Sequence, residues 1–373
     1  MKVAVIAGSR IPSNTANSIQ TMKVCQSLKR LGHDVRLYVP GEESEPWDKL
    51  AALYGIEERF EIVWLNAPLI WKRYDFIWNA VQQSRQWGAA LVYTWMSPAA
   101  VLALHYKMAV ILEIHDRPTG RLGPIWLQQF IKISGKKRLL PITHALNSYL
   151  AKRFNPYLDA ADVMVAPMGT EPERYEDLPE SGKARSLLGL PEGFTVGYTG
   201  HLYPGRGADL LFELARRIPN ANFLWVGGNS RDVMYWKDRL AEAGMNNVTL
   251  TGFVDNQQIP VYQAAADVLL MPYERVIEVS GGGNTADFCS PMKMFDYLCA
   301  GRAIISSDLP VLREILNTEN AILCPAGDID AWSLALNELI HDAPKCERLA
   351  SGAKKDAINF TWLDRARRSL EGF

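Results

Sequence analysis

The sequence predicts an α/β protein built from two domains, each with a doubly wound parallel sheet. Short apolar runs alternate with helix-like stretches along most of the chain, as is typical of repeated strand–helix–strand units. The pattern begins at residues 2–8 and starts again at residues 194–200. With 373 residues, the chain is long enough for two domains that each bury a core.

The first half contains seven candidate strands. Val24, Leu28 and Leu31 form a helical stripe that ends before Gly32, and further helices are expected over 98–106 and 145–153. The apolar runs that predict the strands are 2–8, 35–40, 60–65, 89–95, 109–114, 139–143 and, at the sheet edge, 163–167.

The second half repeats this arrangement. Its predicted strands are 194–200, 221–228, 247–252, 267–273 and 303–307. The two halves are expected to meet near residues 167–191, a segment that lies between the two sets of strands.

Composition and charge exclude several classes of function. A formal net charge of −1 argues against nucleic acid as the main partner. Five cysteines without paired spacing or clustered histidines favour neither a disulfide framework nor a metal site. No apolar stretch reaches the roughly 18 residues of a membrane span. We therefore expect a cytoplasmic protein, soluble or at most bound to the inner membrane surface.

The segment from Cys289 to Leu316 predicts a helix that faces an anion. Ser290 suits an N-cap and Pro291 the first helical position, while Gly301 suits the end of the helix. Lys293 in the first turn opposes the helix dipole unless a negative ligand offsets it. Asp296 lies three residues on, on the same helix face. A cation for a diphosphate and a carboxylate for a ribose diol indicate a nucleotide-sugar site.

The string from Ser290 to Tyr297 also resembles the donor-site signature of retaining glycosyltransferases of family 4, and the resemblance extends over nearly the whole chain. It implies the GT-B fold, with two Rossmann-like domains that face across a cleft. The expected parts are an acceptor-side domain over 1–170, a nucleotide-sugar domain over 171–360, and a C-terminal helix over 361–373 that crosses back to the first domain.

The resemblance also implies the reaction. The family moves a sugar from a nucleoside diphosphate donor to a glycan or a lipid-linked acceptor, with retention at the anomeric carbon and without a metal or cofactor. Polysaccharide or glycolipid synthesis is the expected context. One departure is clear: the first acid of the family signature is replaced by Phe288. The candidate substitutes in catalysis are the carboxylate of Asp287 beside it and the backbone N–H groups around Cys289.

Further donor-site residues follow from the resemblance. The Gly-rich loop over 200–211 carries His201 and Arg206 near the positions where the family grips the diphosphate. Phe253 and Val254 match a segment beside the nucleobase. For His201, packing within the loop is an equal alternative, and for the 252–274 segment plain strand-to-helix packing can hold together with base contact.

In the first half, His115 ends a predicted strand, where open α/β sheets carry ligands. The resemblance makes it the catalytic histidine facing the transferred sugar; a satisfied polar residue is the alternative. Asp116 is expected either to orient its ring or to cap the following turn.

The loop over 9–18 offers Ser13, Asn14, Thr15 and Asn17 for the acceptor or the donor phosphate, the alternative being a turn with an N-cap. It also resembles the phosphate loop of flavodoxin-like flavin reductases, which would not explain the second half. The glycines over 281–284 are a candidate cleft loop.

Seven tryptophans of the first half, together with basic residues, suit a membrane surface, although most of these tryptophans are expected in the core. They are Trp47, Trp64, Trp71, Trp78, Trp87, Trp95 and Trp126, and the basic cluster is Lys132, Lys136, Lys137 and Arg138. Two other functions stay open on the same fold: nucleotide-sugar epimerisation or hydrolysis, and nucleotide-sugar binding without catalysis.

Overall fold

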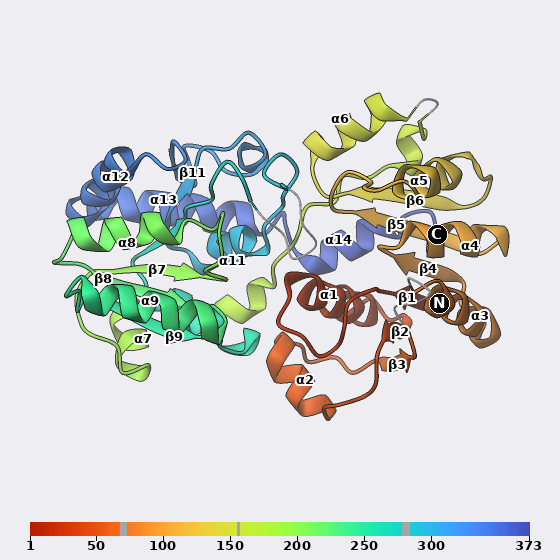
Figure 1. Cartoon of the computed structure of the whole chain (residues 1–373), viewed down its shortest axis with the longest axis horizontal. Coiled ribbons are helices and arrows are strands. Elements are labelled where there is room, and N and C mark those ends of the chain that lie inside the picture. The colour runs from red at the N-terminus through yellow and green to blue at the C-terminus, as the bar shows by residue number, and fades with distance from the viewer. Residues whose placement is uncertain (68–72, 155–156, 278–283) are drawn as a thin grey trace. The chain divides into compact units, whose positions relative to one another are not determined.

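The computed structural model describes residues 1–67, 73–154, 157–277 and 284–373. The chain divides into two compact units, one formed by Met1–Pro167 with Trp362–Phe373 and the other by Met168–Thr361. Each unit is built around its own six-stranded sheet, and every strand pairing in both sheets is parallel. The two predicted Rossmann-like sheets are confirmed (Figure 1).

The first unit has the strand order β3-β2-β1-β4-β5-β6. Its strands are β1 (Lys2–Ile6), β2 (Asp34–Pro40), β3 (Glu61–Leu65), β4 (Leu91–Thr94), β5 (Ala109–Ile114) and β6 (Lys137–Pro141). Its helices are α1 (Ala16–Arg30), α2 (Trp47–Tyr54), α3 (Tyr74–Trp87), α4 (Ser97–His105), α5 (Gly123–Lys132), α6 (His144–Arg153) and the C-terminal α14 (Trp362–Ser369). Helix α14 packs on α1 within this unit (Figure 1).

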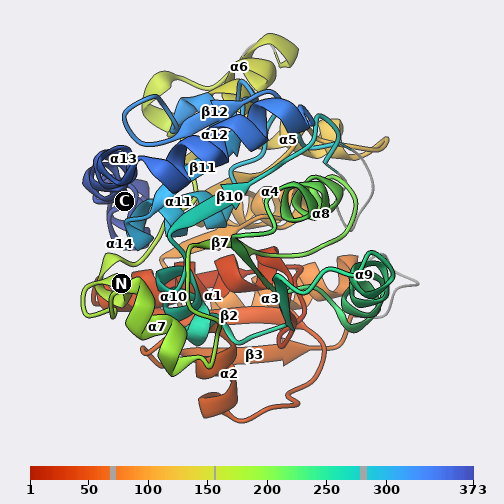
Figure 2. The same ribbon diagram turned by 90° about the vertical axis from the view of Figure 1, so that its left-hand side faces the viewer.

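The second unit has the equivalent order, β12-β11-β10-β7-β8-β9. Its strands are β7 (Thr195–Thr199), β8 (Asn222–Val226), β9 (Val248–Gly252), β10 (Val268–Met271), β11 (Ala303–Ser307) and β12 (Ile322–Cys324). Its helices are α7 (Ser181–Leu187), α8 (Ala208–Arg217), α9 (Ser230–Glu242), α10 (Ile259–Ala264), α11 (Met292–Ala300), α12 (Ile329–His341) and α13 (Ala343–Ala357). Helices α8 and α9 lie on opposite faces of this sheet (Figure 1), while α12 and α13 pack beside β11 (Figure 2).

Large apolar side chains fill the core of the second unit. Trp225 on β8 and Trp332 on α12 have no exposed surface, and aliphatic residues from β7, β10 and β11 surround them. Burial of apolar surface on this scale stabilises the sheet and so fixes the loops at its carboxyl edge.

The predicted seventh strand of the first unit, residues 163–167, is only an isolated bridge between Val163 and Leu139. The N–H groups of Met164 and Ala166 do bond to β6. The carbonyls of Ala166 and Pro167, however, accept hydrogen bonds from the Arg365 side chain instead of from another strand.

The helix that the sequence predicts after Ser290 begins later than expected. Helix α11 starts at Met292, Pro291 is its N-cap residue, and no side chain caps it, so Ser290 lies outside the helix. The predicted end at Gly301 is confirmed.

Both sheets reverse their strand order at one point, between β1 and β4 in the first unit and between β7 and β10 in the second. In open α/β sheets the loops at the carboxyl ends of these strands form the ligand-binding crevice. Each unit is therefore expected to carry its functional residues on the loops after these strands.

Candidate functional site

In the second unit, the loop after β7 approaches its neighbours too closely for side chains at two glycines. A Cβ on Gly207, where φ is 77°, would lie 1.9 Å from the carbonyl oxygen of Pro272. A Cβ on Gly200, where φ is 139°, would lie 2.5 Å from Nζ of Lys293. Glycine tolerates both the backbone conformation and the contact. The loop after β7 thus lies directly against the segment after β10 and against α11.

Arg206 extends from this loop and is held by two tyrosines. Its Nη1 donates to the Tyr273 hydroxyl at 2.8 Å and its Nη2 to the Tyr203 hydroxyl at 2.8 Å. Its Nε is buried and has no hydrogen-bond partner in the described residues. The two tyrosine hydroxyls fix the guanidinium in place. Its Nε–H remains unused, and a buried N–H left unpaired costs free energy.

Lys293, in the first turn of α11, lies in the same cluster. Its Nζ is 3.9 Å from the centre of the Tyr198 ring and 5.6 Å from that of Tyr273. Burial lowers the pKa of Lys293 well below its usual range, and the nearby charge of Arg206 lowers it further. No carboxylate of the described residues forms an ion pair with either cation. Two adjacent basic groups without a carboxylate partner in the described residues can attract an anion.

Ser290 and Asp296 contact the segment that begins the second unit. The Ser290 hydroxyl accepts a hydrogen bond from the Met168 N–H at 3.1 Å. Asp296 accepts one from the Thr170 hydroxyl at 3.0 Å. Both residues, which were predicted to bind the nucleotide-sugar donor, therefore also make a contact within the protein.

The other predicted residues of the second unit differ in their surroundings. The His201 ring stacks on Tyr203 at 5.2 Å between centres, and its carbonyl accepts from the Tyr198 hydroxyl at 2.5 Å. Phe253 is exposed, and Val254 packs against the buried group around Leu224.

Asp287, the candidate substitute for the missing acid, is exposed in a turn, whereas Phe288 is buried. Most of the candidate cleft loop, residues 281–283, lies outside the described residues.

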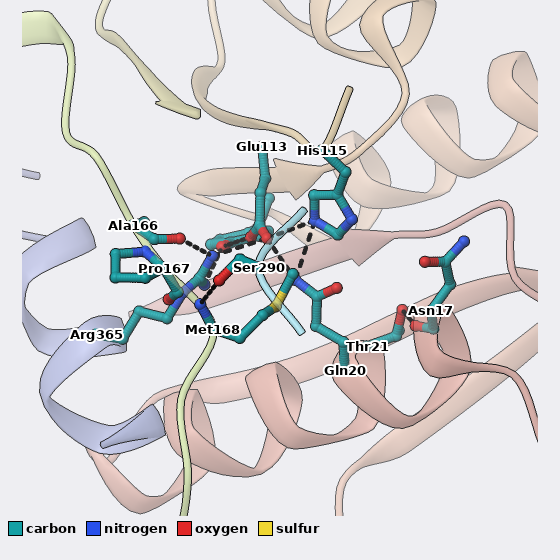
Figure 3. Close-up of polar contacts among 11 residues, drawn as sticks. Asn17, Gln20, Thr21, Glu113, His115, Ala166, Pro167, Met168, Ser290 and Arg365 are labelled. Carbon is teal, nitrogen blue, oxygen red and sulfur yellow. Dashed lines mark hydrogen bonds and ion pairs between the residues drawn. The ribbon is translucent and has the colours of Figure 1, made fainter. Parts of the chain in front are cut away.

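In the first unit, His115 belongs to a buried network at the end of β5. Its Nε2 lies 2.8 Å from Oε1 of Glu113, and the same oxygen accepts from the Gln20 amide. Tyr93 donates to the other carboxylate oxygen, and Arg365 forms an ion pair with Oε1 at 2.7 Å. Figure 3 shows the His115 ring and the Gln20 amide both directed at this carboxylate.

Glu113 is ionised in this network. Burial by itself would raise the pKa of Glu113, but the Arg365 charge and the hydrogen bonds from His115 and Tyr93 lower that pKa to about 2. Asp116 was expected either to orient the His115 ring or to cap the following turn. In the structure its Oδ1 accepts a hydrogen bond from the N–H of Arg117, the next residue, at 2.7 Å. Glu113 and its partner Arg365 were not among the residues predicted from the sequence.

The loop after β1 carries the four other predicted residues. Ser13 donates its N–H to the Tyr54 hydroxyl at 2.7 Å, and Thr15 caps α1 by accepting from the Ser18 N–H. Asn14, Thr15 and Asn17 have exposed side chains. An N-cap and exposed polar groups thus share one loop.

The basic cluster of the first unit is largely structural. Lys137 is buried and donates to the carbonyls of Phe130, Ile131 and Ile133 at the end of α5. Arg138 donates to the carbonyls of Arg368 and Ser369 in the C-terminal segment.

The expectation that most of the tryptophans lie in the core is wrong. Of the six that the described ranges include, none is fully buried, and Trp78 is 50% exposed; Trp71 lies outside the described residues. In the described part of the chain, every helix is too short or too polar to cross a bilayer. Its residues also include no group of three metal-ligating side chains.

Comparison with known proteins adds to this geometry. Residues 193–342 match the family model of the group 1 glycosyl transferases. The match spans less than half of the chain, but it includes β7, α8, β10 and α11, the elements that carry Arg206 and Lys293.

Two relatives illustrate the similarity in sequence. The chain is 31% identical over 126 residues to the glycosyltransferase TuaH of Bacillus subtilis, named for teichuronic acid biosynthesis; the match covers 34% of this chain and 30% of TuaH. It is 22% identical over 360 residues to a GDP-mannose-dependent α-(1-6)-phosphatidylinositol monomannoside mannosyltransferase of Mycolicibacterium smegmatis, covering 91% of this chain and 90% of the relative. The chain thus spans less than a third of TuaH.

The fold is that of solved GT-B glycosyltransferases. HepE of Anabaena, in complex with UDP-glucose, superposes with a TM-score of 0.75 at 16% identity over 100% of this chain and 98% of HepE. At this identity the likeness shows the fold alone.

Proposed function

We propose that this chain is a glycosyltransferase that moves a sugar from a nucleoside diphosphate donor to a glycan or lipid-linked acceptor. The observation that carries the proposal is the pair of cations Arg206 and Lys293, without a carboxylate partner among the described residues, at the point where the second sheet reverses its strand order. The family match over the same elements supports it.

The donor residues have distinct roles in this proposal. Arg206 and Lys293 bind the diphosphate, together with the free N–H groups at the start of α11. Asp296 accepts from the ribose hydroxyls, and Phe253 and Val254 lie at the nucleobase. Ser290 and His201 line the donor site. The contact of Ser290 with Met168 and that of His201 with Tyr203 hold the two side chains in position.

Catalysis in this proposal is mainly electrostatic. Negative charge grows on the leaving diphosphate in the transition state, and fixed cations stabilise it more than they stabilise the bound donor. Arg206 and Lys293 can supply this stabilisation without a divalent metal. The transfer proceeds with retention at the anomeric carbon and without a cofactor. The carboxylate of Asp287 takes the role of the first acid of the family signature, whose position Phe288 occupies.

The first unit is proposed to bind the acceptor. His115 contacts the transferred sugar, and Ser13, Asn14, Thr15 and Asn17 offer hydroxyl and amide groups to acceptor or phosphate. Peripheral contact with the inner membrane face is proposed through the exposed side chains of this unit, since aromatic residues favour the interface. These are Tyr74, Trp78, Leu122 and Ile125.

A second candidate, nucleotide-sugar binding without catalysis, is favoured by one observation. Phe288 is buried where the family signature has its first acid, and Asp287 is exposed beside it. The same fold with epimerase or hydrolase activity would give product without an acceptor.

One experiment separates the three. Donors are first selected from a panel of nucleotide sugars by thermal shift, since a ligand at about 100 times its dissociation constant adds about 2.7 kcal/mol to stability. Release of nucleoside diphosphate is then followed with and without alkyl glycosides or phospholipid vesicles as acceptors. Transfer predicts release that depends on acceptor; release without acceptor would indicate hydrolysis, and binding without release would favour the non-catalytic function.

A further inference from the structure

We propose that Glu113 and Arg365 are positioning residues, which hold the His115 ring with its proton on Nε2 and leave Nδ1 as the acceptor for a sugar hydroxyl. This inference rests on the proposed function, because it assigns His115 a role toward the transferred sugar. The ring geometry itself can be tested without any substrate.

A charged carboxylate at Glu113 is unusual for its position. The side chain has no exposed surface and belongs to the interior, otherwise apolar strand β5. A buried charge is tolerated only with close partners. Arg365 supplies the counter-ion at 2.7 Å, and the Tyr93 hydroxyl and Gln20 amide supply hydrogen bonds to the two oxygens. The carboxylate is therefore fixed in orientation.

The fixed carboxylate determines the state of the imidazole. An ionised carboxylate can only accept, so the contact of 2.8 Å from Nε2 of His115 to Oε1 of Glu113 requires the ring proton to lie on Nε2. The Gln20 amide lies 3.1 Å from the same ring nitrogen and donates to the same Glu113 oxygen. In the described residues Nδ1 has no partner, and the side chain is 26% exposed. A ring whose single proton lies on Nε2 presents a lone pair on Nδ1.

Arg365 connects this arrangement to the C-terminal helix. Besides the ion pair, its guanidinium donates to the Pro167 carbonyl at 2.8 Å, to the Ala166 carbonyl at 3.1 Å and to the Tyr93 hydroxyl at 3.1 Å. Helix α14, which carries Arg365, packs on α1, which carries Gln20. The ring of His115 is therefore held directly by side chains from α1 and β5, and α14 acts on it through the ion pair of Arg365 with Glu113.

The first test measures the tautomer by long-range ¹H–¹⁵N NMR of the histidine rings, without ligand. His115→Gln identifies the signal among the six histidines. We expect a single Nε2–H form in the wild type and a mixture of tautomers in Glu113→Leu/Arg365→Met, which removes both charges together because a buried pair often tolerates apolar replacement. The control Glu61→Leu/Arg36→Met removes a more exposed pair of the same sheet and should leave the signal unchanged.

The second test measures turnover. The double variant should lower turnover about 10- to 100-fold while the donor KM stays near that of the wild type. His115→Asn, whose amide oxygen lies near the position of Nδ1, should retain more turnover than His115→Gln, whose amide lies near Nε2. These two variants keep the ion pair and so remain informative if the double variant does not fold.

Three results would overturn the inference: a wild-type ring protonated on Nδ1, the same single tautomer in the double variant, or His115→Gln at least as active as His115→Asn. A failure of the proposed function is distinguishable. It would appear as a wild type that turns over no nucleotide sugar, whereas the NMR result still decides whether Glu113 and Arg365 set the ring.

Discussion

The Nζ atom of Lys293 lies 3.9 Å from the centre of the Tyr198 ring and has no carboxylate partner among the described residues. The ring face attracts the ammonium by about 0.5–2 kcal/mol, yet burial and Arg206 lower the pKa of Lys293 well below its usual range. The aromatic contact therefore only partly offsets the cost of the charge. Without a bound anion, the site keeps a cation at the expense of stability, as is common where function requires it.

Replacing Lys293 by methionine should therefore stabilise the protein without ligand and reduce its stabilisation by ligand. We expect a gain of about 1 kcal/mol, or about 2–4 °C in Tm. Because the pKa of Lys293 is lowered in the folded state, the wild type gains stability as the pH rises toward the pKa that Lys293 has in the unfolded chain. The stability difference between Lys293→Met and the wild type should therefore shrink as the pH rises. Thermal melts with and without a nucleoside diphosphate test this, with the exposed Lys183→Met as control. A variant with the full wild-type ligand shift would refute the assignment.

Asp296→Asn should lower donor affinity about tenfold, equal to about 1.4 kcal/mol, because an amide replaces a carboxylate acceptor for the ribose. Affinities are compared between ribose donors and their 2′- and 3′-deoxy analogues. The deoxy donors should lose little further in the variant. Equal deoxy penalties in wild type and variant would show that Asp296 does not contact the ribose.

His115→Ala should lower turnover on the order of a hundredfold and leave donor affinity nearly unchanged. This is the pattern for a group whose interaction is made mainly in the transition state. Both quantities are measured on one preparation whose folding is checked by thermal melt. Near-normal turnover would make His115 a packing residue.

Acid should destabilise the protein partly through Glu113. Its pKa is about 2 in the folded state and about 4.3 in an unfolded chain, so its contribution is complete above the unfolded value and is lost as pH falls toward the folded value. Between pH 5 and pH 3 the wild type should lose about 2 kcal/mol more than Glu113→Gln. Denaturant unfolding at both pH values measures the difference, and equal losses would contradict the ionised state of Glu113.

The sheets were predictable from local pattern, because a buried parallel strand reads as a short apolar run. The three-residue strand β12, Ile322–Cys324, was missed because so short a run carries little signal. Arg206 and Lys293 were both predicted. Their aromatic surroundings were not, because Tyr273, which follows β10, meets Tyr198, Tyr203 and the β7 loop only in the fold.

Glu113 had a signal that could have been used: one acidic residue inside the apolar run of β5. A charge buried in an interior strand requires a partner. The partner itself was beyond local reasoning, since Arg365 lies in the C-terminal helix and only tertiary packing brings it to β5.

The most direct test of the account is calorimetric titration of the protein with UDP, GDP and ADP, in parallel with the Arg206→Ala and Lys293→Ala variants. Each variant removes a charge-assisted contact worth about 1.5–3 kcal/mol. We predict that at least one diphosphate binds the wild type and binds each variant about 10- to 150-fold more weakly, while Arg313→Ala, which breaks an exposed pair with Asp308, binds as the wild type does. Unchanged affinity in both site variants, or no binding of any diphosphate to the wild type, would contradict the account.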